Sequence, residues 1–174
     1  MEAGGRAVTA FGRSRTRPPT GWRRIVVRLP IALYRIGLGP VFGKRMLLLQ
    51  HTGRVSGQTR EVCLEVVAHD PLRGSWTVAS GFGTAAQWYR NLRHIPKVTI
   101  QVGRTFHPVN AHFLSAEEGA ELMAAYAGRH PRAARALCRY LGLDDPKDGT
   151  DPFRAAGLRI PFVRLDEVPP RRWG

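Results

Sequence analysis

The chain has 174 residues, of which 43% are hydrophobic and 23% are charged, a composition typical of one globular domain. Its 27 Lys and Arg residues outnumber 13 Asp and Glu residues, which gives a net charge of +14 and favours an anionic ligand or surface as partner. No segment is long and apolar enough to span a membrane. The two cysteines and six histidines lack the spacing of a metal site, so none is expected.

The N-terminal quarter of the chain is predicted to lie outside the main domain. Residues 1–20 are rich in Arg, Gly, Pro, Ser and Thr, which predicts a disordered basic tail, with a transit peptide as the alternative. Residues 21–43 combine apolar side chains with arginines, which is typical of an amphipathic segment, although Pro30 interrupts any single long helix. Such a segment suits either a membrane interface or packing against the domain or a second subunit.

Residues 44–168 carry the pattern of an α+β domain, and residues 169–174 are predicted to be a loose tail. Short β-rich runs predict six strands, at residues 46–49, 59–68, 76–80, 98–102, 106–114 and 162–166. Helices are predicted at residues 84–92, 115–127 and 131–141, and a loop at residues 144–152. Ser115 and Glu118 form the capping box that opens the second of these helices.

The first predicted hairpin, residues 44–60, contains the sequence KRMLLLQHTGRVSGQTR. Two β-rich runs flank a polar turn with two glycines, and Arg54 and Arg60 frame that turn. Backbone amides and guanidinium groups together suit an anion such as phosphate. Taken alone, the stretch fits a phosphate site and a solvated basic turn equally well.

A second motif, SGFGTAAQWYRNLRHIPKVTIQV at residues 80–102, changes that balance. With TGRVSGQTR it resembles the deazaflavin-dependent nitroreductase and F420H2-dependent quinone reductase family, over residues 44–114 and more weakly at residues 160–165. The resemblance implies a split β-barrel of the flavin-reductase-like type, with about six mostly antiparallel strands, an N-terminal helix and C-terminal helices. It also implies coenzyme F420 as cofactor and hydride transfer to a planar, electron-poor acceptor such as a quinone or nitro compound.

The same resemblance implies a cofactor groove formed by three parts of the chain. The hairpin turn would bind the phosphate with Thr52, Arg54, Ser56, Gly57 and Arg60. The ring would lie near Leu64, Ala79 and Ser80, and the loop Gly81, Phe82 and Gly83 would close on it, with Gln87, Trp88 and Asn91 from the next helix. Two structural alternatives stay open: Trp88 as an aromatic anchor of that helix, and Asn91 as its C-terminal cap.

The sequence departs from the family pattern at two positions of the cofactor groove and in one segment of the substrate wall. Val55 stands where the family often has lysine, and Phe82 where small or basic residues are common. Residues 130–136 read HPRAARA, whereas quinone- and nitroimidazole-reducing members are rich in tyrosine there. His130 is a candidate proton donor, with a surface histidine at a helix start as the alternative. The resemblance therefore does not name the acceptor.

Other functions are also compatible with the sequence. The split barrel could hold FMN or haem instead, or the basic chain could be a non-enzymatic binder of anionic membrane or nucleic acid. Nucleic acid is not expected, because no RRM, KH, helix-turn-helix or zinc-finger signature is present. Cys63 and Cys138 are expected to be reduced thiols, on a strand and a helix, in a cytoplasmic monomer or homodimer. Peripheral contact with the inner face of the membrane would use residues 21–42.

Overall fold

The computed structural model describes residues 45–140, 149 and 151–169. The predicted tail at residues 1–20 and the amphipathic segment at residues 21–43 lie outside these residues, as does nearly all of the predicted C-terminal tail. The predictions made for them therefore stay predictions.

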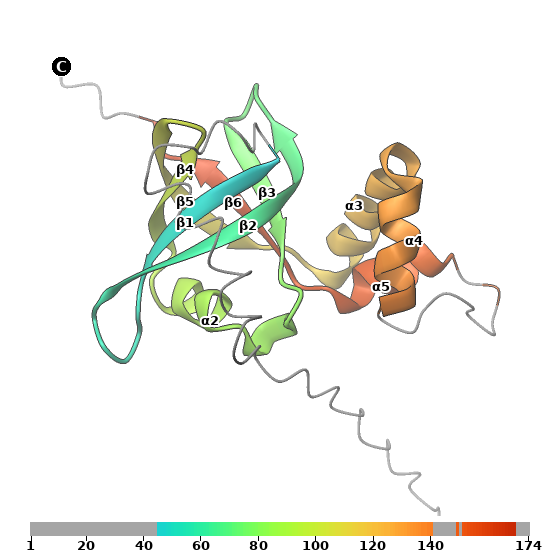
Figure 1. Cartoon of the computed structure of the whole chain (residues 1–174), viewed down its shortest axis with the longest axis horizontal. Coiled ribbons are helices and arrows are strands. Elements are labelled where there is room, and N and C mark those ends of the chain that lie inside the picture. Colours follow the sequence, from blue (N-terminus) through green and yellow to red (C-terminus); the bar gives the residue numbers. More distant parts are fainter. Residues whose placement is uncertain (1–44, 141–148, 150, 170–174) are drawn as a thin grey trace, which may run out of the picture.

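Six antiparallel strands close into a barrel in the order β1-β2-β3-β6-β5-β4 (Figure 1). The strands are β1 (Met46–Thr52), β2 (Thr59–Asp70), β3 (Ser75–Ala79), β4 (Lys97–Val102), β5 (Thr105–Phe113) and β6 (Phe162–Glu167). Every neighbouring pair is antiparallel, including the pair β1–β4 that closes the ring. The predicted α+β split-barrel fold and all six strands are confirmed, with bounds that differ by a few residues.

The barrel interior is filled by side chains that alternate along the strands. Leu47 and Leu49 on β1 point inward, and so do Val78 on β3 and Ile100 on β4. These side chains are buried from solvent, and they account for the short apolar runs in the sequence.

Helix α2 (Gln87–His94) packs against one end of the barrel (Figure 1). Its Trp88 and Leu92 lie one helical turn apart and are both buried in the barrel core. The sequence predicts one helix over residues 84–92, but the structure has a 3-10 helix, η2 (Gly83–Ala85), and then α2. The predicted helix is interrupted because Ala86 adopts an extended conformation, with φ −56° and ψ 133°, between η2 and α2.

Three further helices form a lobe beside the barrel (Figure 1): α3 (Ala116–Arg129), α4 (Pro131–Tyr140) and α5 (Pro152–Arg159). The capping box at the start of α3 is confirmed. The Glu118 amide donates to Ser115 Oγ at 3.2 Å, and the Ser115 amide donates to Glu118 Oε2 at 2.7 Å. The lobe has its own apolar core, which includes Met123 and Phe162.

Helix α5 is not predicted from the sequence, and the loop predicted for residues 144–152 ends where this helix begins. The Asp151 side chain accepts a hydrogen bond from the Phe153 amide at 2.9 Å, and Pro152 occupies the first turn. Aspartate followed by proline is a helix-start signal. The acidic, proline-containing sequence before it favours a loop on composition alone, so the sequence analysis did not recognise the start of the helix.

Helices α3 and α5 cross at two glycines. A Cβ atom on Gly157 would lie 2.5 Å from the Ala120 Cα atom, and one on Gly119 would lie 2.7 Å from the Gly157 carbonyl oxygen. Both distances are shorter than van der Waals contact, so the close approach of the two backbones requires glycine.

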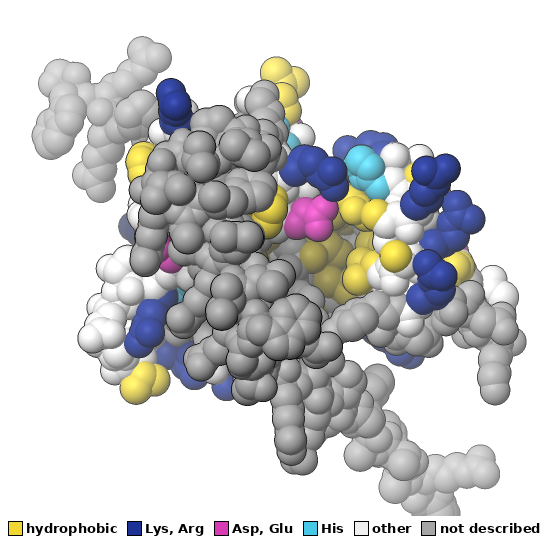
Figure 2. Space-filling model, in the orientation of Figure 1, with side chains coloured by type: hydrophobic (Ala, Val, Ile, Leu, Met, Phe, Trp, Pro, Cys, Tyr) yellow, Lys and Arg dark blue, Asp and Glu magenta, His cyan; other side chains and the backbone are white. Residues whose placement is uncertain are grey.

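Basic side chains concentrate on the outer surface of the helical lobe. Arg132, Arg135 and Arg139 on α4 are exposed and follow a helical spacing of three and four residues. Figure 2 shows Lys and Arg side chains along this edge, with apolar side chains toward the barrel. No helix within the described ranges is long and apolar enough to cross a membrane.

The two cysteines lie where the sequence predicts them, Cys63 on β2 and Cys138 on α4. Neither forms a disulfide bond, and the Cys138 Sγ donates to the Pro152 carbonyl at 3.5 Å. Burial raises the pKa of the Cys63 thiol to about 11, with a weaker opposing effect from a backbone hydrogen bond at Leu64. A thiol with so high a pKa is poorly suited to act as a nucleophile at neutral pH.

Candidate functional site

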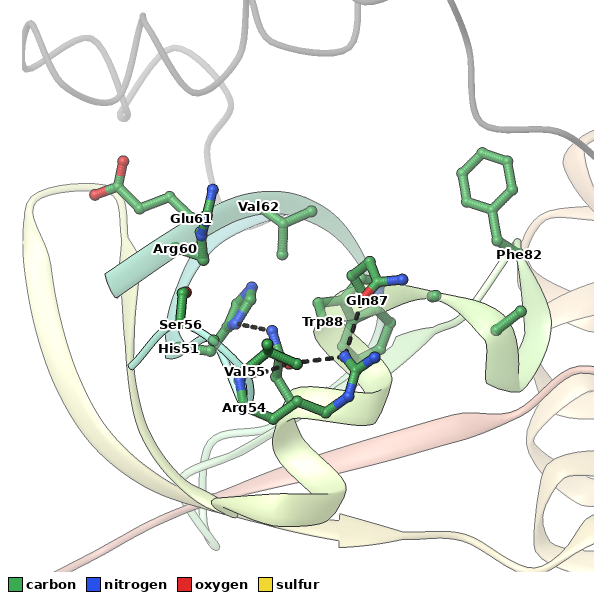
Figure 3. A pocket seen from close by; sticks show the side chains of 14 residues that line it. His51, Arg54, Val55, Ser56, Arg60, Glu61, Val62, Phe82, Gln87 and Trp88 are labelled. Atoms are coloured by element: carbon green, nitrogen blue, oxygen red, sulfur yellow. Dashed lines mark hydrogen bonds between the residues drawn. The ribbon is translucent and has the colours of Figure 1, made fainter. Parts of the chain in front are cut away.

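A cavity of about 750 Å³ lies between the β1–β2 turn, strand β2 and the segment from η2 to α2 (Figure 3). Seven of the fourteen residues predicted to form the cofactor groove line it: Arg54, Ser56, Arg60, Phe82, Gln87, Trp88 and Asn91. The hairpin and the residue 80–102 motif are therefore brought together by the fold. Their juxtaposition makes one site from two segments that are separate in the sequence.

The other predicted residues do not line this cavity: Thr52, Gly57, Leu64, Ala79, Ser80, Gly81 and Gly83. Some of them have structural roles nearby. Leu64 packs against the barrel core, and the Ser80 hydroxyl donates to the Gly83 carbonyl at 2.7 Å, which holds the turn before α2. Gly57 adopts φ 65°, a conformation that favours glycine, and so allows the hairpin turn to close.

The cavity also contains residues that the sequence analysis missed: His51, Gly53, Val55, Glu61, Val62, Ala85 and Ala86. Val55 was singled out only as a departure from the family pattern. His51 carried a signal, since it continues the inward-facing alternation of Leu47 and Leu49 up to the TGR motif. That signal shows the direction of a side chain but not that a cavity lies there.

The β1–β2 turn is compact and presents hydrogen-bond donors. The Gly53 amide donates to the Gln58 carbonyl and the Gly57 amide to the Gly53 carbonyl, both at 2.8 Å. A Cβ atom at Gly53 would lie 2.8 Å from Ser56 Oγ, so a larger residue there requires the Ser56 side chain to rotate. At its tip, the amides of Val55 and Ser56 have no acceptor among the described residues. Such adjacent amides suit an anion.

Arg54 connects this turn to helix α2. Its backbone amide donates to Asn91 Oδ1 at 3.1 Å, and its Nη1 donates to Gln87 Oε1 at 2.8 Å and to Asn91 Oδ1 at 3.2 Å (Figure 3). Arg60 differs from it, because its guanidinium is exposed and contacts only Gln58 Oε1, at 3.4 Å, among the described residues. Arg60 is thus the arginine better placed to bind an anion.

The structural alternatives for the two α2 residues have different outcomes. The C-cap of α2 is Ile95, so the alternative that Asn91 caps the helix is wrong. Asn91 lies inside the helix and is buried, and its side chain forms hydrogen bonds with Arg54 and His51. Trp88 does anchor α2 in the barrel core and also lines the cavity, so its contact with a ligand stays a prediction.

His51 is buried at the inner end of the cavity, with its Nδ1 3.0 Å from Asn91 Nδ2. Burial lowers the pKa of its imidazole; the Thr52 carbonyl acts in the opposite direction, and the positive charge of Arg60 lowers the pKa further. His51 is therefore neutral at pH 7.

The proton-donor candidate His130 lies outside this cavity. It is the exposed C-cap of α3, and its ring packs beside Tyr126 with 5.0 Å between the ring centres. The described residues also contain no group of three or more His, Cys, Asp or Glu side chains that could hold a metal ion.

A family model described as F420H(2)-dependent quinone reductase matches residues 26–136. The chain belongs to this family. The match includes every residue that lines the cavity, and it identifies the protein as an oxidoreductase with coenzyme F420 as its cofactor. Among curated proteins, none matches the chain.

Several solved structures are similar to this chain. An F420H2-dependent reductase, FDR-A, is 22% identical over 71% of this chain and 96% of its own, with a TM-score of 0.48. A protein described as a domain-swapped dimer is 21% identical over 84% of this chain and 100% of its own, with a TM-score of 0.50. An FMN-binding protein from Nostoc punctiforme, related to pyridoxamine 5'-phosphate oxidase, is 15% identical over 86% and 82%, with a TM-score of 0.48.

The chemistry of the cavity fits the family's coenzyme, which carries a planar ring and a phosphate. The β1–β2 turn supplies the Arg60 guanidinium and unpaired amides, which suit the phosphate. Trp88 on α2, Val62 on β2 and Phe82 before η2 give the rest of the lining an apolar and aromatic character that suits a flat ring. The donor-rich turn and the apolar lining face the same cavity, so one molecule can place its phosphate against the turn and its ring against the apolar side chains.

Proposed function

We propose that this protein transfers a hydride from reduced coenzyme F420 to a planar, electron-poor acceptor, either quinone-like or a nitro compound. The observation that carries the proposal is the single cavity with a donor-rich turn at one side and an aromatic wall at the other. Bound there, the coenzyme supplies the hydride, and the protein's task is to hold and orient it.

The residues of the cavity have separate roles in this proposal. Arg60, Ser56 and the amides at the tip of the turn bind the phosphate, and Arg54 holds that turn against α2 rather than acting as the main phosphate ligand. Trp88 and Val62 flank the ring, while Phe82, 47% exposed, lies at the mouth of the cavity and limits the acceptor's approach. Burial of the ring between such groups excludes water from the reacting atoms.

Neither histidine supplies an imidazolium to the cavity, because the pKa of His51 is lowered by burial and His130 lies outside the cavity. The acceptor's proton would then come from solvent, because this cavity opens to the surface at the exposed Val55 and Phe82. Planar acceptors with delocalised charge suit such a site, since a quinone or nitro group can take up the hydride's electrons before it is protonated.

The test is a titration of purified protein with coenzyme F420, followed by the coenzyme's fluorescence. Saturable binding at micromolar concentration or tighter supports the proposal, and a screen of quinones and nitro compounds with the reduced coenzyme then names the acceptor. Absence of binding would contradict it. Titration with FMN and an absorbance spectrum of the purified protein, run in parallel, test FMN and haem as the alternative ligands.

The assembly and location of the protein remain separate proposals. A monomer or homodimer is distinguished by light scattering after size-exclusion chromatography. Peripheral attachment to the inner face of a membrane, through residues 21–42, is tested by sedimentation with anionic vesicles, comparing the full chain with a variant that lacks these residues. Salt-insensitive or absent retention on heparin would exclude nucleic acid as a partner.

A further inference from the structure

The orientation of the Asn91 side chain is determined by its neighbours. A backbone amide and a guanidinium nitrogen can only donate hydrogen bonds. Arg54 directs both at the same atom of Asn91, at 3.1 Å and 3.2 Å, so that atom must be the carbonyl oxygen Oδ1. The amide nitrogen Nδ2 is consequently the atom that faces His51.

This orientation assigns the tautomer of His51. The Asn91 Nδ2 group only donates, and it lies 3.0 Å from His51 Nδ1, so Nδ1 has to accept. A neutral imidazole has one proton, which must then be on Nε2. An imidazolium would place an N–H against an N–H at this distance, and Asn91 cannot turn over without losing both bonds from Arg54.

The Nε2 atom faces the side of the cavity that strand β2 forms. His51 and Arg60 are directly paired in the register of β1 and β2, so their side chains leave the sheet on the same face. Both line the cavity, and Figure 3 shows the ring nitrogen that is not bonded to Asn91 pointing toward β2 at Arg60 and Val62. A fixed N–H donor thus lies beside the exposed guanidinium.

We propose that His51 is a binding residue of the coenzyme site, whose neutral Nε2–H donates to a phosphate oxygen beside Arg60, and that Asn91 is the positioning residue that fixes this tautomer. The inference rests on the proposed function, because it names a further contact at the same site. His51 serves as a donor without gaining a charge, since a second proton on Nδ1 would face the N–H group of Asn91 Nδ2 at 3.0 Å. The charged side chains that line the cavity with it are Arg54, Arg60 and Glu61.

The tautomer is measured directly by ¹⁵N-edited NMR of the imidazole in the full-length protein without coenzyme. The His51 signals are assigned by their loss in His51→Gln. At pH 7 the wild type should show a protonated Nε2 and a bare Nδ1. Asn91→Asp keeps oxygen acceptors for Arg54 but places an acceptor opposite Nδ1, so it should move the proton to Nδ1 or make the ring an imidazolium. A wild-type ring with its proton on Nδ1 would overturn the assignment.

The contact with the coenzyme is measured by fluorescence titration of the same proteins with F420. His51→Phe should weaken binding about tenfold, and His51→Gln, which retains a neutral N–H donor, should weaken it less. His130→Phe, an exposed histidine outside the cavity, should leave affinity unchanged. If the wild type binds F420 and a folded His51→Phe binds it equally tightly, this inference is overturned and the proposed function stands. If His51→Phe does not fold, equal affinity of the wild type, His51→Gln and Asn91→Asp has the same meaning. Failure of the wild type to bind F420 would overturn both.

Discussion

The side chain of Asn91 accepts two hydrogen bonds from Arg54, one from its backbone amide and one from its guanidinium, although 37 residues separate them in the chain. Asn91 is buried in α2, whereas Arg54 belongs to the β1–β2 turn. These hydrogen bonds hold the β1–β2 turn against α2 along one side of the cavity.

Arg54 and Gln87 should be energetically coupled. Arg54 Nη1 donates to Gln87 Oε1 at 2.8 Å at an exposed position, so a double-mutant cycle of Arg54→Ala and Gln87→Ala should give a coupling energy of about 0.5–1.5 kcal/mol. Urea unfolding of the four proteins measures it. The control cycle pairs Arg54→Ala with Glu117→Ala, an exposed change on α3, where the two effects should add. Additivity in both cycles would show that the contact contributes nothing.

Arg60→Ala should weaken binding of coenzyme F420 about tenfold or more, because it removes a charge-assisted contact to the phosphate. The measurement is the fluorescence titration, with circular dichroism to check folding. Arg104→Ala is the matched control: it removes the same charge from an exposed turn between β4 and β5 that does not line the cavity. Equal losses in the two variants would mean that net charge, and not a specific contact, determines affinity.

Gly157→Ala should destabilise the fold by about 1–3 kcal/mol, because the added Cβ atom would lie 2.5 Å from the Ala120 Cα atom where α5 crosses α3. Gly128→Ala is the control within the same lobe. A Cβ atom there meets nothing within 4 Å, so this change should stabilise helix α3 by about 0.5–1 kcal/mol. Urea unfolding measures both. Destabilisation of similar size in both variants would contradict the crossing as the cause.

Stability should fall as the pH decreases through the region below the ordinary histidine pKa, in part because of His51. Its pKa is lowered in the folded protein, chiefly by burial, so the unfolded chain binds the proton more readily. Neutral His51 makes its full contribution to the free energy of unfolding above a pH of about 6.5, which is the histidine pKa in the unfolded chain. Below that pH the contribution decreases, until the pH reaches the lower pKa of the folded protein.

The midpoint of thermal unfolding, followed from pH 8 to pH 5, tests this dependence. His51→Gln should show a shallower decrease than the wild type, because the substituted residue does not titrate. His130→Gln, an exposed change at the C-cap of α3, serves as the control and should retain the wild-type slope. A wild-type slope in His51→Gln would exclude His51 as a source of the pH dependence.

The thiols should react slowly in the native protein. With a pKa of about 11, the Cys63 thiol at pH 8 is ionised only to roughly one part in a thousand. Cys138 is 2% exposed, so access limits its reaction. Labelling with a chromogenic disulfide at pH 8 should be slow without denaturant and should reach two thiols per chain in guanidinium chloride. Complete labelling of native Cys63 within seconds would contradict the burial described for it.

Local interactions explain which elements the sequence predicts. The six strands follow from short apolar runs, and the start of α3 follows from the reciprocal hydrogen bonds of Ser115 and Glu118, which lie within one turn. Helix α5 shows the limit, since its Asp151–Pro152 start signal lies in a composition that also favours a loop. Such a segment becomes helical when its face with Ala156 and Gly157 is buried against α3.

By itself, the sequence determined the barrel's strands, the glycine-dependent turn at Gly57, and the motifs that assign the family. These depend on alternation, backbone conformation and residue spacing, which are properties of neighbours in the chain. Only the tertiary structure decided that Arg54 binds α2, that Arg60 faces the cavity, and that Asn91 holds the tautomer of His51. Each of these depends on contacts between side chains that lie 9 to 40 residues apart in the sequence. Such side chains come into contact only when the barrel closes and α2 packs against its end.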